Sequence, residues 1–266
     1  MCNDGSPAAL YFHKAQAGSP QSNLWLFYLE GGDWCYDASS CATRFKASPQ
    51  FMTTNNWPGI VSLGGIFSAN PRKSPWAGAN KIYVGYCSSD AWVGDVPASP
   101  DTFNMAFRGQ RIVAAALALT VTKFGMGATA GQRLLFSGCS AGSRGAMFTL
   151  DYVPGLLHGM GVPSANLEVQ GLFDSPLWVD VQPITGADGP IVPLQEQTAA
   201  ILNLVNATGR LGPTCTAAFP PGDWWKCLYG QYRLPFVETP YVMNAAQFDK
   251  FQLVRCQPGD VLCLCL

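Results

Sequence analysis

The sequence predicts an α/β fold with a mainly parallel central sheet and helices on both faces. Short apolar runs alternate with longer segments of helical character, and continuous apolar character is typical of strands covered on both faces. Such alternation favours parallel strands joined by helical crossovers. The expected strands are 24–29, 81–86, 133–136, 168–173 and 235–242, and the expected helices are 103–124, 141–152 and 192–207.

Composition narrows the class of protein further. Only 12% of the 266 residues are charged, 48% are hydrophobic, and the net charge is −1. The low charge without a basic block argues against a nucleic-acid partner, and the apolar fraction excludes a disordered chain. No apolar run is long enough to span a membrane. We expect residues 1–266 to form one domain.

The ten cysteines favour disulfides in an oxidising compartment. Their spacing does not resemble a zinc site, so neither a metal nor another cofactor is expected. Cys35 and Cys41 are close enough in sequence to close a small loop, although spacing alone leaves the connectivity open. Segments 37–80 and 208–234 are rich in Pro, Gly, Trp and Cys, which predicts long surface insertions over one edge of the sheet.

Both ends of the sequence suggest part of a longer gene product. Met1 is followed directly by residues 2–5 (CNDG), without a signal peptide. The other end stops at residues 263–266 (CLCL), which are apolar and lack a closing helix. We therefore expect a chain that lacks its signal peptide and is truncated at the C-terminus.

Residues 138–142 (GCSAG) match the pattern G-x-S-x-G between an expected strand and an expected helix. This context is that of a nucleophile elbow, a sharp turn that raises a serine hydroxyl above a sheet. The amide of Ala141 would lie at a helix N-terminus, where N–H groups stabilise an oxyanion. The alternative is an ordinary strand-to-helix turn with a capping serine.

Residues 30–35 (EGGDWC) follow the strand 24–29 and fit the second half of an oxyanion hole. Glycines allow the backbone to turn its amides toward a bound carbonyl group. The alternative is a plain glycine turn, with Trp34 serving for packing rather than as a pocket wall.

These two motifs and several other short segments resemble those of the pectin acetylesterase/Notum family of secreted α/β-hydrolase carboxylesterases. The similarity runs from Cys2 to about Asp180 and is weaker beyond. The blocks that carry it are residues 4–7 (DGSP), 29–35 (LEGGDWC), 70–71 (NP), 86–87 (YC), 94–95 (GD), 107–112 (FRGQRI), 137–142 (SGCSAG), Asp151 and 174–175 (DS).

The resemblance implies an α/β-hydrolase-like fold with Ser140 as the nucleophile. It also implies an oxyanion hole made by the backbone amides of Gly32, Asp33 and Ala141. The pectin acetylesterases usually have glycine at position 33. The Asp33 carboxylate would bring negative charge toward a developing oxyanion, which opposes catalysis.

The family places its acid in a segment resembling Tyr-Asp-x-Trp-Gln. The best match is residues 243–248 (MNAAQF), which puts Asn244 at the acid position. An asparagine does not carry the charge that stabilises an imidazolium, and in the chymotrypsin-type triad replacing Asp by Asn costs about 10⁴-fold in rate. Glu238 and Asp249 remain alternative acids.

The sequence contains no histidine at the place expected for the base. In this fold the chain order is Ser, then acid, then His, and the family's histidine lies beyond residue 266. The sequence has two histidines, His13 and His158. His13 precedes the first core strand and His158 precedes every candidate acid, so neither is expected to accept the serine proton.

The resemblance implies an extracellular, cell-wall serine carboxylesterase. It would remove O-acetyl or other acyl groups from a polysaccharide such as pectin, through an acyl-enzyme on Ser140. We expect a monomer whose partner is the acylated polysaccharide or another ester substrate. The rival hypothesis is a catalytically inactive or truncated family member that acts as a binding protein, because Asn244 replaces the acid and no suitable histidine is present.

Overall fold

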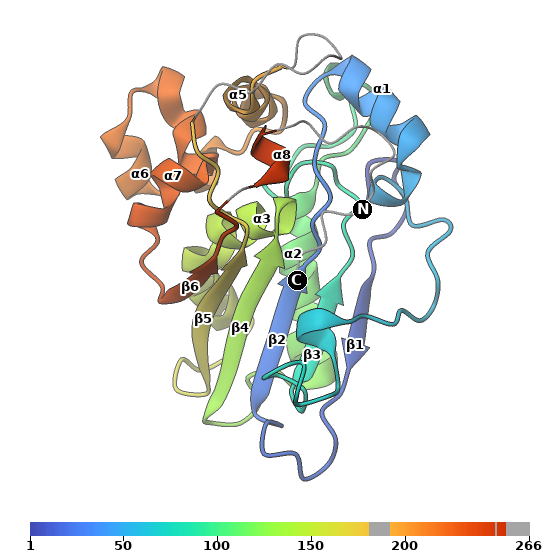
Figure 1. Cartoon of the computed structure of the whole chain (residues 1–266), viewed down its shortest axis with the longest axis vertical. Helices are drawn as coiled ribbons and strands as arrows, with labels where there is room; N and C mark the ends of the chain where they lie inside the picture. The colour runs from blue at the N-terminus through green and yellow to red at the C-terminus, as the bar shows by residue number, and fades with distance from the viewer. Residues whose placement is uncertain (181–191, 248, 254–266) are drawn as a thin grey trace.

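A six-stranded sheet forms the centre of the computed structural model, which describes residues 1–180, 192–247 and 249–253 (Figure 1). Its strand order is β1-β3-β2-β4-β5-β6, and all neighbours are parallel except β1, which runs antiparallel to β3. The expected, mainly parallel α/β sheet is thereby confirmed. The strands are β1 (Leu10–His13), β2 (Leu24–Leu29), β3 (Asn80–Val84), β4 (Gln132–Cys139), β5 (Leu167–Asp174) and β6 (Tyr241–Asn244).

Along the sequence, eight helices alternate with these strands or follow the last of them in the described part of the chain. They are α1 (Ala38–Ala47), α2 (Gly109–Phe124), α3 (Ala141–Thr149), α4 (Val153–Gly159), α5 (Leu194–Leu204), α6 (Pro213–Ala218), α7 (Gly230–Arg233) and α8 (Lys250–Leu253). The three expected helices correspond to α2, α3 and α5. The terminal residues Cys263 and Cys265 lie outside the described part of the chain.

Three expected boundaries were wrong for local reasons. Helix α2 begins at Gly109 rather than at Phe103, because Phe103 and its neighbour have φ angles of 58° and 59°, which no right-handed helix contains. The last strand begins at Tyr241 rather than at 235, because residues 234–236 form a 3₁₀ turn. The helix expected at 141–152 ends at Thr149, because residues 150–152 form a 3₁₀ turn, and Pro154 lies in the first turn of α4, where proline fits.

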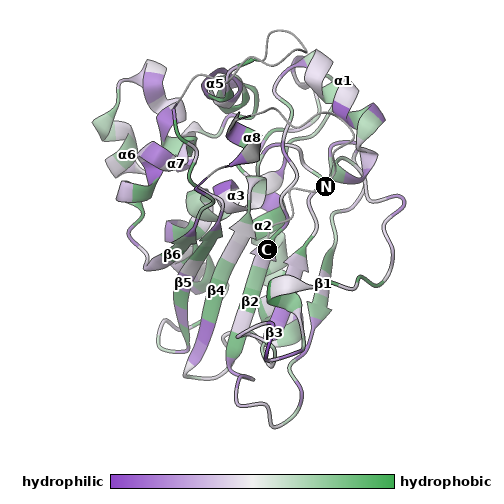
Figure 2. Ribbon diagram, viewed as in Figure 1, coloured by the Kyte–Doolittle hydropathy of each residue, from purple (hydrophilic) through white to green (hydrophobic). Residues whose placement is uncertain are grey.

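The two faces of the sheet are covered differently. On one face Phe124 of α2 stacks on Phe12 of β1 with ring centroids 4.1 Å apart, behind the sheet in Figure 1. On the other face Phe67 packs edge-on against Tyr28 and Tyr83, at 5.1 and 5.5 Å. Figure 2 shows the hydrophobic residues gathered along the central strands. The sheet is therefore buried on both faces, as its apolar runs indicate.

Three disulfides cross-link the described part of the chain. A disulfide closes the small loop that the spacing of Cys35 and Cys41 allows, and it joins α1 to the segment after β2. Two further bonds link Cys2 to Cys87 and Cys215 to Cys227. The insertions that carry α1, α6 and α7 lie beyond the carboxyl ends of the parallel strands, at the top of Figure 1. This edge of the sheet is where ligands bind in open α/β folds.

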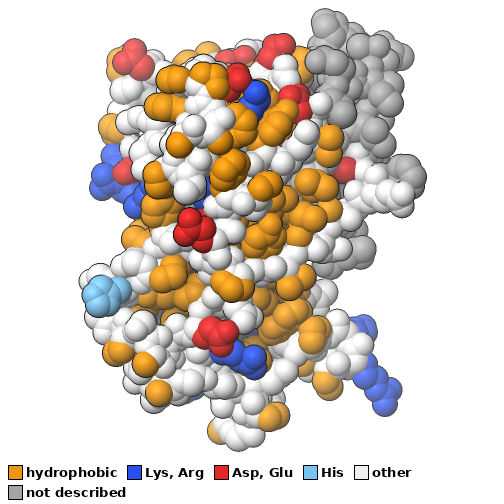
Figure 3. Space-filling model, turned by 90° about the vertical axis from the view of Figure 1, so that its left-hand side faces the viewer, with side chains coloured by type: hydrophobic (Ala, Val, Ile, Leu, Met, Phe, Trp, Pro, Cys, Tyr) orange, Lys and Arg blue, Asp and Glu red, His pale blue; other side chains and the backbone are white. Residues whose placement is uncertain are grey.

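Charged side chains are few on the surface drawn in Figure 3, where they are scattered among hydrophobic and uncharged groups. Among the described residues, no helix combines the length and apolar character needed to cross a membrane. The same residues contain no group of three or more histidine, cysteine or acidic side chains placed to hold a metal ion.

A buried carboxylate fixes the loop that follows β3. Asp90 is fully buried and accepts hydrogen bonds from the Ser88 hydroxyl (2.6 Å) and from the amides of Trp92 (2.9 Å), Gly94 (3.1 Å) and Gly109 (2.8 Å). Burial raises the pKa of Asp90 to about 6, while these four donors oppose the rise. The carboxylate thereby connects the loop after β3 to the first residue of α2.

Replacing Asp90 by alanine should lower the free energy of unfolding by about 3 kcal/mol or more, because three buried amides would lose their acceptor. Chemical denaturation of the two proteins measures the difference. Asp101→Ala is the matched control, since Asp101 is exposed and its loss should cost less than about 0.5 kcal/mol. Equal losses for the two variants would contradict this account of the loop.

Candidate active site

The turn at Ser140 has the backbone of a nucleophile elbow. Ser140 follows the last residue of β4 and precedes α3, with φ 53° and ψ −120°, a conformation that L-residues adopt at a cost of about 1–3 kcal/mol. Its amide donates to the carbonyl oxygen of Asp174 at 3.0 Å. Cys139 and Ala141 are buried, whereas Ser140 is partly exposed. The turn therefore presents one side chain at the carboxyl edge of the sheet.

Two glycines on either side of Ser140 make this turn sterically possible. A Cβ atom at Gly138 would lie 2.3 Å from the carbonyl oxygen of Gly142. A Cβ atom at Gly142 would lie 2.1 Å from the carbonyl oxygen of Leu29, at the end of β2. Both neighbours are backbone atoms, which do not swing aside as a side chain does. The glycines of the G-x-S-x-G pattern are thus required by close backbone packing.

The loop after β2 lies against the elbow. A Cβ atom at Gly31 would lie 2.5 Å from the carbonyl oxygen of Cys139 and 3.3 Å from Cβ of Ser140. The next two residues have positive φ angles, 141° at Gly32 and 61° at Asp33. Aspartate tolerates this left-handed region better than most residues, which explains how a residue other than glycine adopts it here. The side chain of Asp33 is exposed, so water screens its charge.

An arginine from α1 holds this loop in place. The Arg44 guanidinium donates to the carbonyl oxygen of Gly32, and its Nε donates to the Ser89 hydroxyl at 2.9 Å. The same group lies 5.1 Å from the centroid of the Phe51 ring. The Gly32 carbonyl is therefore held by a cation, which helps to fix the peptide groups on either side.

A second arginine lies buried behind the elbow. The Arg144 guanidinium is sandwiched between Trp34 and Trp178, 4.2 and 3.8 Å from their ring centroids, and donates to the Thr198 hydroxyl at 3.0 Å. Burial lowers the pKa of Arg144 to about 9. Trp34 is thus a packing partner of a cation, a role that no sequence pattern predicted. The contact joins α3 to the loop after β2, the loop after β5 and α5.

Asn244 lies at the same edge of the sheet as Ser140. It is the last residue of β6 and pairs in register with Asp174, the last residue of β5. The Asn244 amide nitrogen donates to a carboxylate oxygen of Asp174 at 2.9 Å. Burial raises the pKa of Asp174, and the hydrogen bonds from Asn244 and Ser175 oppose this rise. The register of β5 and β6 brings this carboxylate beside Asn244.

The two alternative acids lie on either side of β6 in the sequence. Glu238 is exposed on the segment before β6. The Asp249 carboxylate accepts from the Phe251 amide (2.9 Å) and from the Gln252 side chain (2.7 Å), so it serves the start of α8.

Neither histidine lies near the elbow. His13 ends β1 and pairs with Lys81 near the start of β3, at the sheet edge opposite to Ser140. His158 is in the last turn of α4, and both imidazoles are exposed. The described residues therefore bring together Ser140, the loop at Gly32 and Asp33, and the pair formed by Asp174 and Asn244, but not an imidazole.

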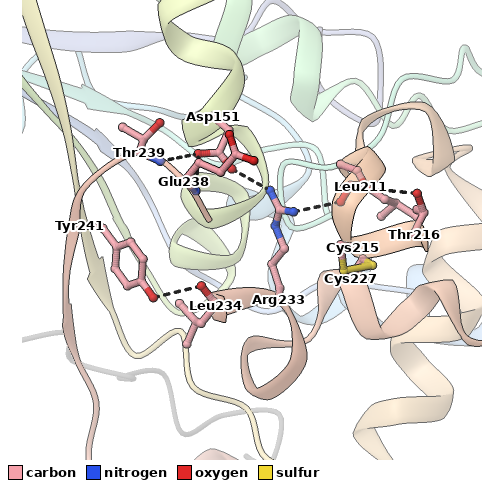
Figure 4. Close-up of polar contacts among 11 residues, drawn as sticks. Asp151, Leu211, Cys215, Thr216, Cys227, Arg233, Leu234, Glu238, Thr239 and Tyr241 are labelled. Carbon is pink, nitrogen blue, oxygen red and sulfur yellow. Dashed lines mark hydrogen bonds and ion pairs between the residues drawn. A yellow bond between two sulfur atoms is a disulfide. The ribbon is translucent and has the colours of Figure 1, made fainter. Parts of the chain in front are cut away.

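A nearly buried ion pair fixes the approach to β6. Arg233 donates to one Asp151 oxygen at 3.2 Å and to the carbonyl oxygen of Leu211 at 3.1 Å (Figure 4). The other Asp151 oxygen accepts from the amides of Glu238 (3.1 Å) and Thr239 (2.9 Å). Asp151 thereby holds the segment that leads into β6, the strand that ends at Asn244.

Replacing Asp151 by alanine should lower the free energy of unfolding by about 3–5 kcal/mol, because it leaves the buried Arg233 cation without its partner. Denaturant titration measures the change. The control is Arg111→Ala, which breaks the more exposed pair with Asp95 and should cost less than about 1 kcal/mol. A similar small loss for both variants would show that the Asp151 pair does not fix this segment.

Replacing Gly31 by alanine should destabilise the protein by about 1–3 kcal/mol, because the new methyl group meets the fixed carbonyl of Cys139. Thermal unfolding gives the change in stability. In Gly59→Ala the new methyl group meets nothing within 4 Å, so this variant should unfold like the parent protein. A parent-like Gly31→Ala protein would mean that the loop does not press against the elbow.

Comparison with known proteins agrees with this geometry. The family model described as pectinacetylesterase matches residues 1–259. The palmitoleoyl-protein carboxylesterase NOTUM of Mus musculus is 32% identical over 254 residues, which are 95% of this chain and 48% of the relative. Pectin acetylesterase 11 of Arabidopsis thaliana is 31% identical over 258 residues, which are 95% of this chain and 60% of the relative.

Among solved structures, the Wnt deacylase Notum from Drosophila superimposes with a TM-score of 0.83 and 33% identity, covering 95% of this chain and 70% of that one. The chain spans between 36% and 50% of the length of the curated NOTUM relatives that it matches. The α/β fold and the match along nearly all of the sequence lead to one conclusion: this chain belongs to the pectinacetylesterase family.

Proposed function

We propose that this protein is a serine carboxylesterase with Ser140 as its nucleophile. The backbone amides of Gly32, Asp33 and Ala141 form the oxyanion hole. The observation that carries the proposal is the contact between the loop and the elbow, where a Cβ atom at Gly31 would lie 3.3 Å from Cβ of Ser140. This contact supports the proposal, because acyl transfer requires backbone donors from more than one segment close to the nucleophile.

The reaction follows from these roles. An imidazole takes the proton from the Ser140 hydroxyl while the oxygen bonds to the ester carbonyl carbon. The carbonyl oxygen gains negative charge and accepts hydrogen bonds from the amides of the oxyanion hole. The bond to the leaving alcohol breaks, and the alcohol takes the proton back from the imidazolium. Water then attacks the acyl-enzyme by the same steps and releases the carboxylic acid.

In our proposal, neither histidine of these 266 residues supplies the imidazole. His13 and His158 are the only histidines of the sequence, and both lie away from Ser140. Acylation therefore needs either an imidazole group of another chain segment or an imidazole supplied in solution. This requirement shapes the experiment below.

The substrate we propose is an O-acyl ester carried by a polysaccharide such as acetylated pectin, or by another acylated partner. By their names, one group of relatives acts on palmitoleoylated protein and the other on pectin acetyl esters. The three described disulfides support an extracellular location, for example the cell wall, because such bonds persist in oxidising surroundings. We propose that the protein acts there as a monomer.

The second candidate is a binding protein without catalytic activity. Two points favour it: the imidazoles lie away from Ser140, and the sequence match assigns the acid position to Asn244, which has no charge. Such a protein would retain acylated ligands at the same edge of the sheet without cleaving them.

Ser140→Ala should abolish covalent labelling of the full chain by a fluorophosphonate probe, measured by intact mass and peptide mapping with imidazole added to the buffer. Labelling of the parent protein should be confined to Ser140. Ser143→Ala is the matched control: its buried hydroxyl has no hydrogen-bond partner among the described residues, so its loss should leave labelling intact.

Equal labelling of the parent and the Ser140→Ala protein would refute the nucleophile assignment. A parent protein that stays unlabelled but binds an acetylated polysaccharide in calorimetry would establish the second candidate instead.

A further inference from the structure

One short motif of the sequence has no part in the proposed reaction. Residues 206–208 (NAT) match the acceptor pattern for N-glycosylation, which is Asn-x-Ser/Thr with any residue except proline in the middle. No other asparagine of the sequence has serine or threonine two positions later. A pattern this short also arises by chance, so its meaning depends on the structure around Asn206.

Asn206 lies at the surface, directly after the end of α5, the helix at the top of Figure 1. Its φ angle of 50° is left-handed, a conformation in which asparagine often follows a helix. Asn206 and Thr208 are both exposed, whereas Ala207 between them is fully buried. The turn therefore leaves the two polar residues of the motif in solvent and anchors them through the apolar residue between them.

The backbone on both sides of Asn206 is held by hydrogen bonds. The Val205 carbonyl accepts from the amide of Asp95 at 3.3 Å, which connects the end of α5 to the loop after β3. The Ala207 carbonyl accepts from the amide of Arg210 at 3.2 Å. The motif is thus part of a fixed surface turn in the folded protein.

The atom that would carry a sugar has no competing contact. The Asn206 side-chain nitrogen donates to none of the described residues, and the side-chain oxygen lies 3.5 Å from the Thr208 hydroxyl. There is also room beside it, because a Cβ atom at the neighbouring Gly209 would meet nothing within 4 Å. A glycan is bulky and hydrated, so it needs both a free amide nitrogen and open space.

The disulfides connect the chain to the compartment in which this modification takes place. N-glycans are added in the lumen of the endoplasmic reticulum, whose oxidising conditions also allow disulfides to form. The bonds Cys2–Cys87, Cys35–Cys41 and Cys215–Cys227 indicate that the chain folds under such conditions.

We propose that Asn206 is an N-glycosylation site and that Thr208 directs the modification. The donor is an oligosaccharide carried on a lipid diphosphate. The side-chain nitrogen of Asn206 bonds to C1 of the first sugar, the bond from that carbon to the phosphate oxygen breaks, and the nitrogen releases one proton. The attached glycan keeps the surface at the end of α5 in solvent and excludes a closely packed partner there. This inference does not depend on the esterase assignment.

The alternative explanation for Asn206 is purely conformational. A helix that ends in a left-handed residue favours Gly or Asn at that position whether or not a glycan is attached. The conformational role gives Thr208 no task, because among the described residues its hydroxyl approaches only the Asn206 side chain. Variants of Thr208 therefore separate the two explanations.

The test is secretion of the full chain from cultured mammalian cells behind a signal sequence, followed by treatment with peptide-N-glycosidase. The enzyme should lower the intact mass of the parent protein by one glycan and leave aspartate at position 206 in the peptide map. Thr208→Ala keeps Asn206 and should remove the mass step, whereas Thr208→Ser keeps the hydroxyl and should retain it. Asn203→Gln is the matched control, since Asn203 is exposed on α5 outside the motif and its loss should not change the step.

Asn206→Gly provides a second variant should Thr208→Ala not be secreted. Glycine adopts the left-handed conformation without strain, so this protein should fold, melt like the deglycosylated parent and carry no glycan. A secreted parent protein whose mass does not change with the enzyme overturns the proposal. A mass step that persists in Thr208→Ala or in Asn206→Gly overturns it as well.

Discussion

Close packing of backbone against backbone around Ser140 is the constraint on which the rest of the site depends. The end of β2, the end of β4 and the start of α3 approach so closely that Gly31, Gly138 and Gly142 leave no room for a Cβ atom. At this junction a Cβ atom at Gly31 would lie 3.3 Å from Cβ of Ser140, whose own backbone has a φ angle of 53°. The oxyanion hole that we propose is thus a consequence of how two neighbouring parallel strands meet one helix.

Contacts from distant parts of the chain keep this junction rigid. Arg44 from α1 holds the Gly32 carbonyl, and Arg144 from α3 lies between two tryptophans of the flanking loops. The ion pair between Asp151 and Arg233 does the same for the approach to β6. Preorganised donors stabilise a developing charge without reorganising during the reaction, so in the proposed mechanism these cations and ion pairs would contribute without touching the substrate.

The sequence predicted the parts of the site that are encoded locally. The elbow at 138–142 and the glycine loop at 31–32 follow from short patterns, because steric requirements act between near neighbours. The pairing of Asp174 with Asn244 could not be predicted, since it depends on the register of two strands separated by about 70 residues. An aspartate at the end of the strand next to the elbow strand was the available signal. Arg144 gave none, because its partners come from three separate segments.

A crystal structure of the full chain after reaction with a serine-directed phosphonate would test the central claim most directly. We predict a covalent bond from Ser140 Oγ to phosphorus, with one phosphonyl oxygen within hydrogen-bond distance of the amides of Ala141 and of Gly32 or Asp33. An adduct on another residue, or a phosphonyl oxygen directed to solvent away from these amides, would contradict the account.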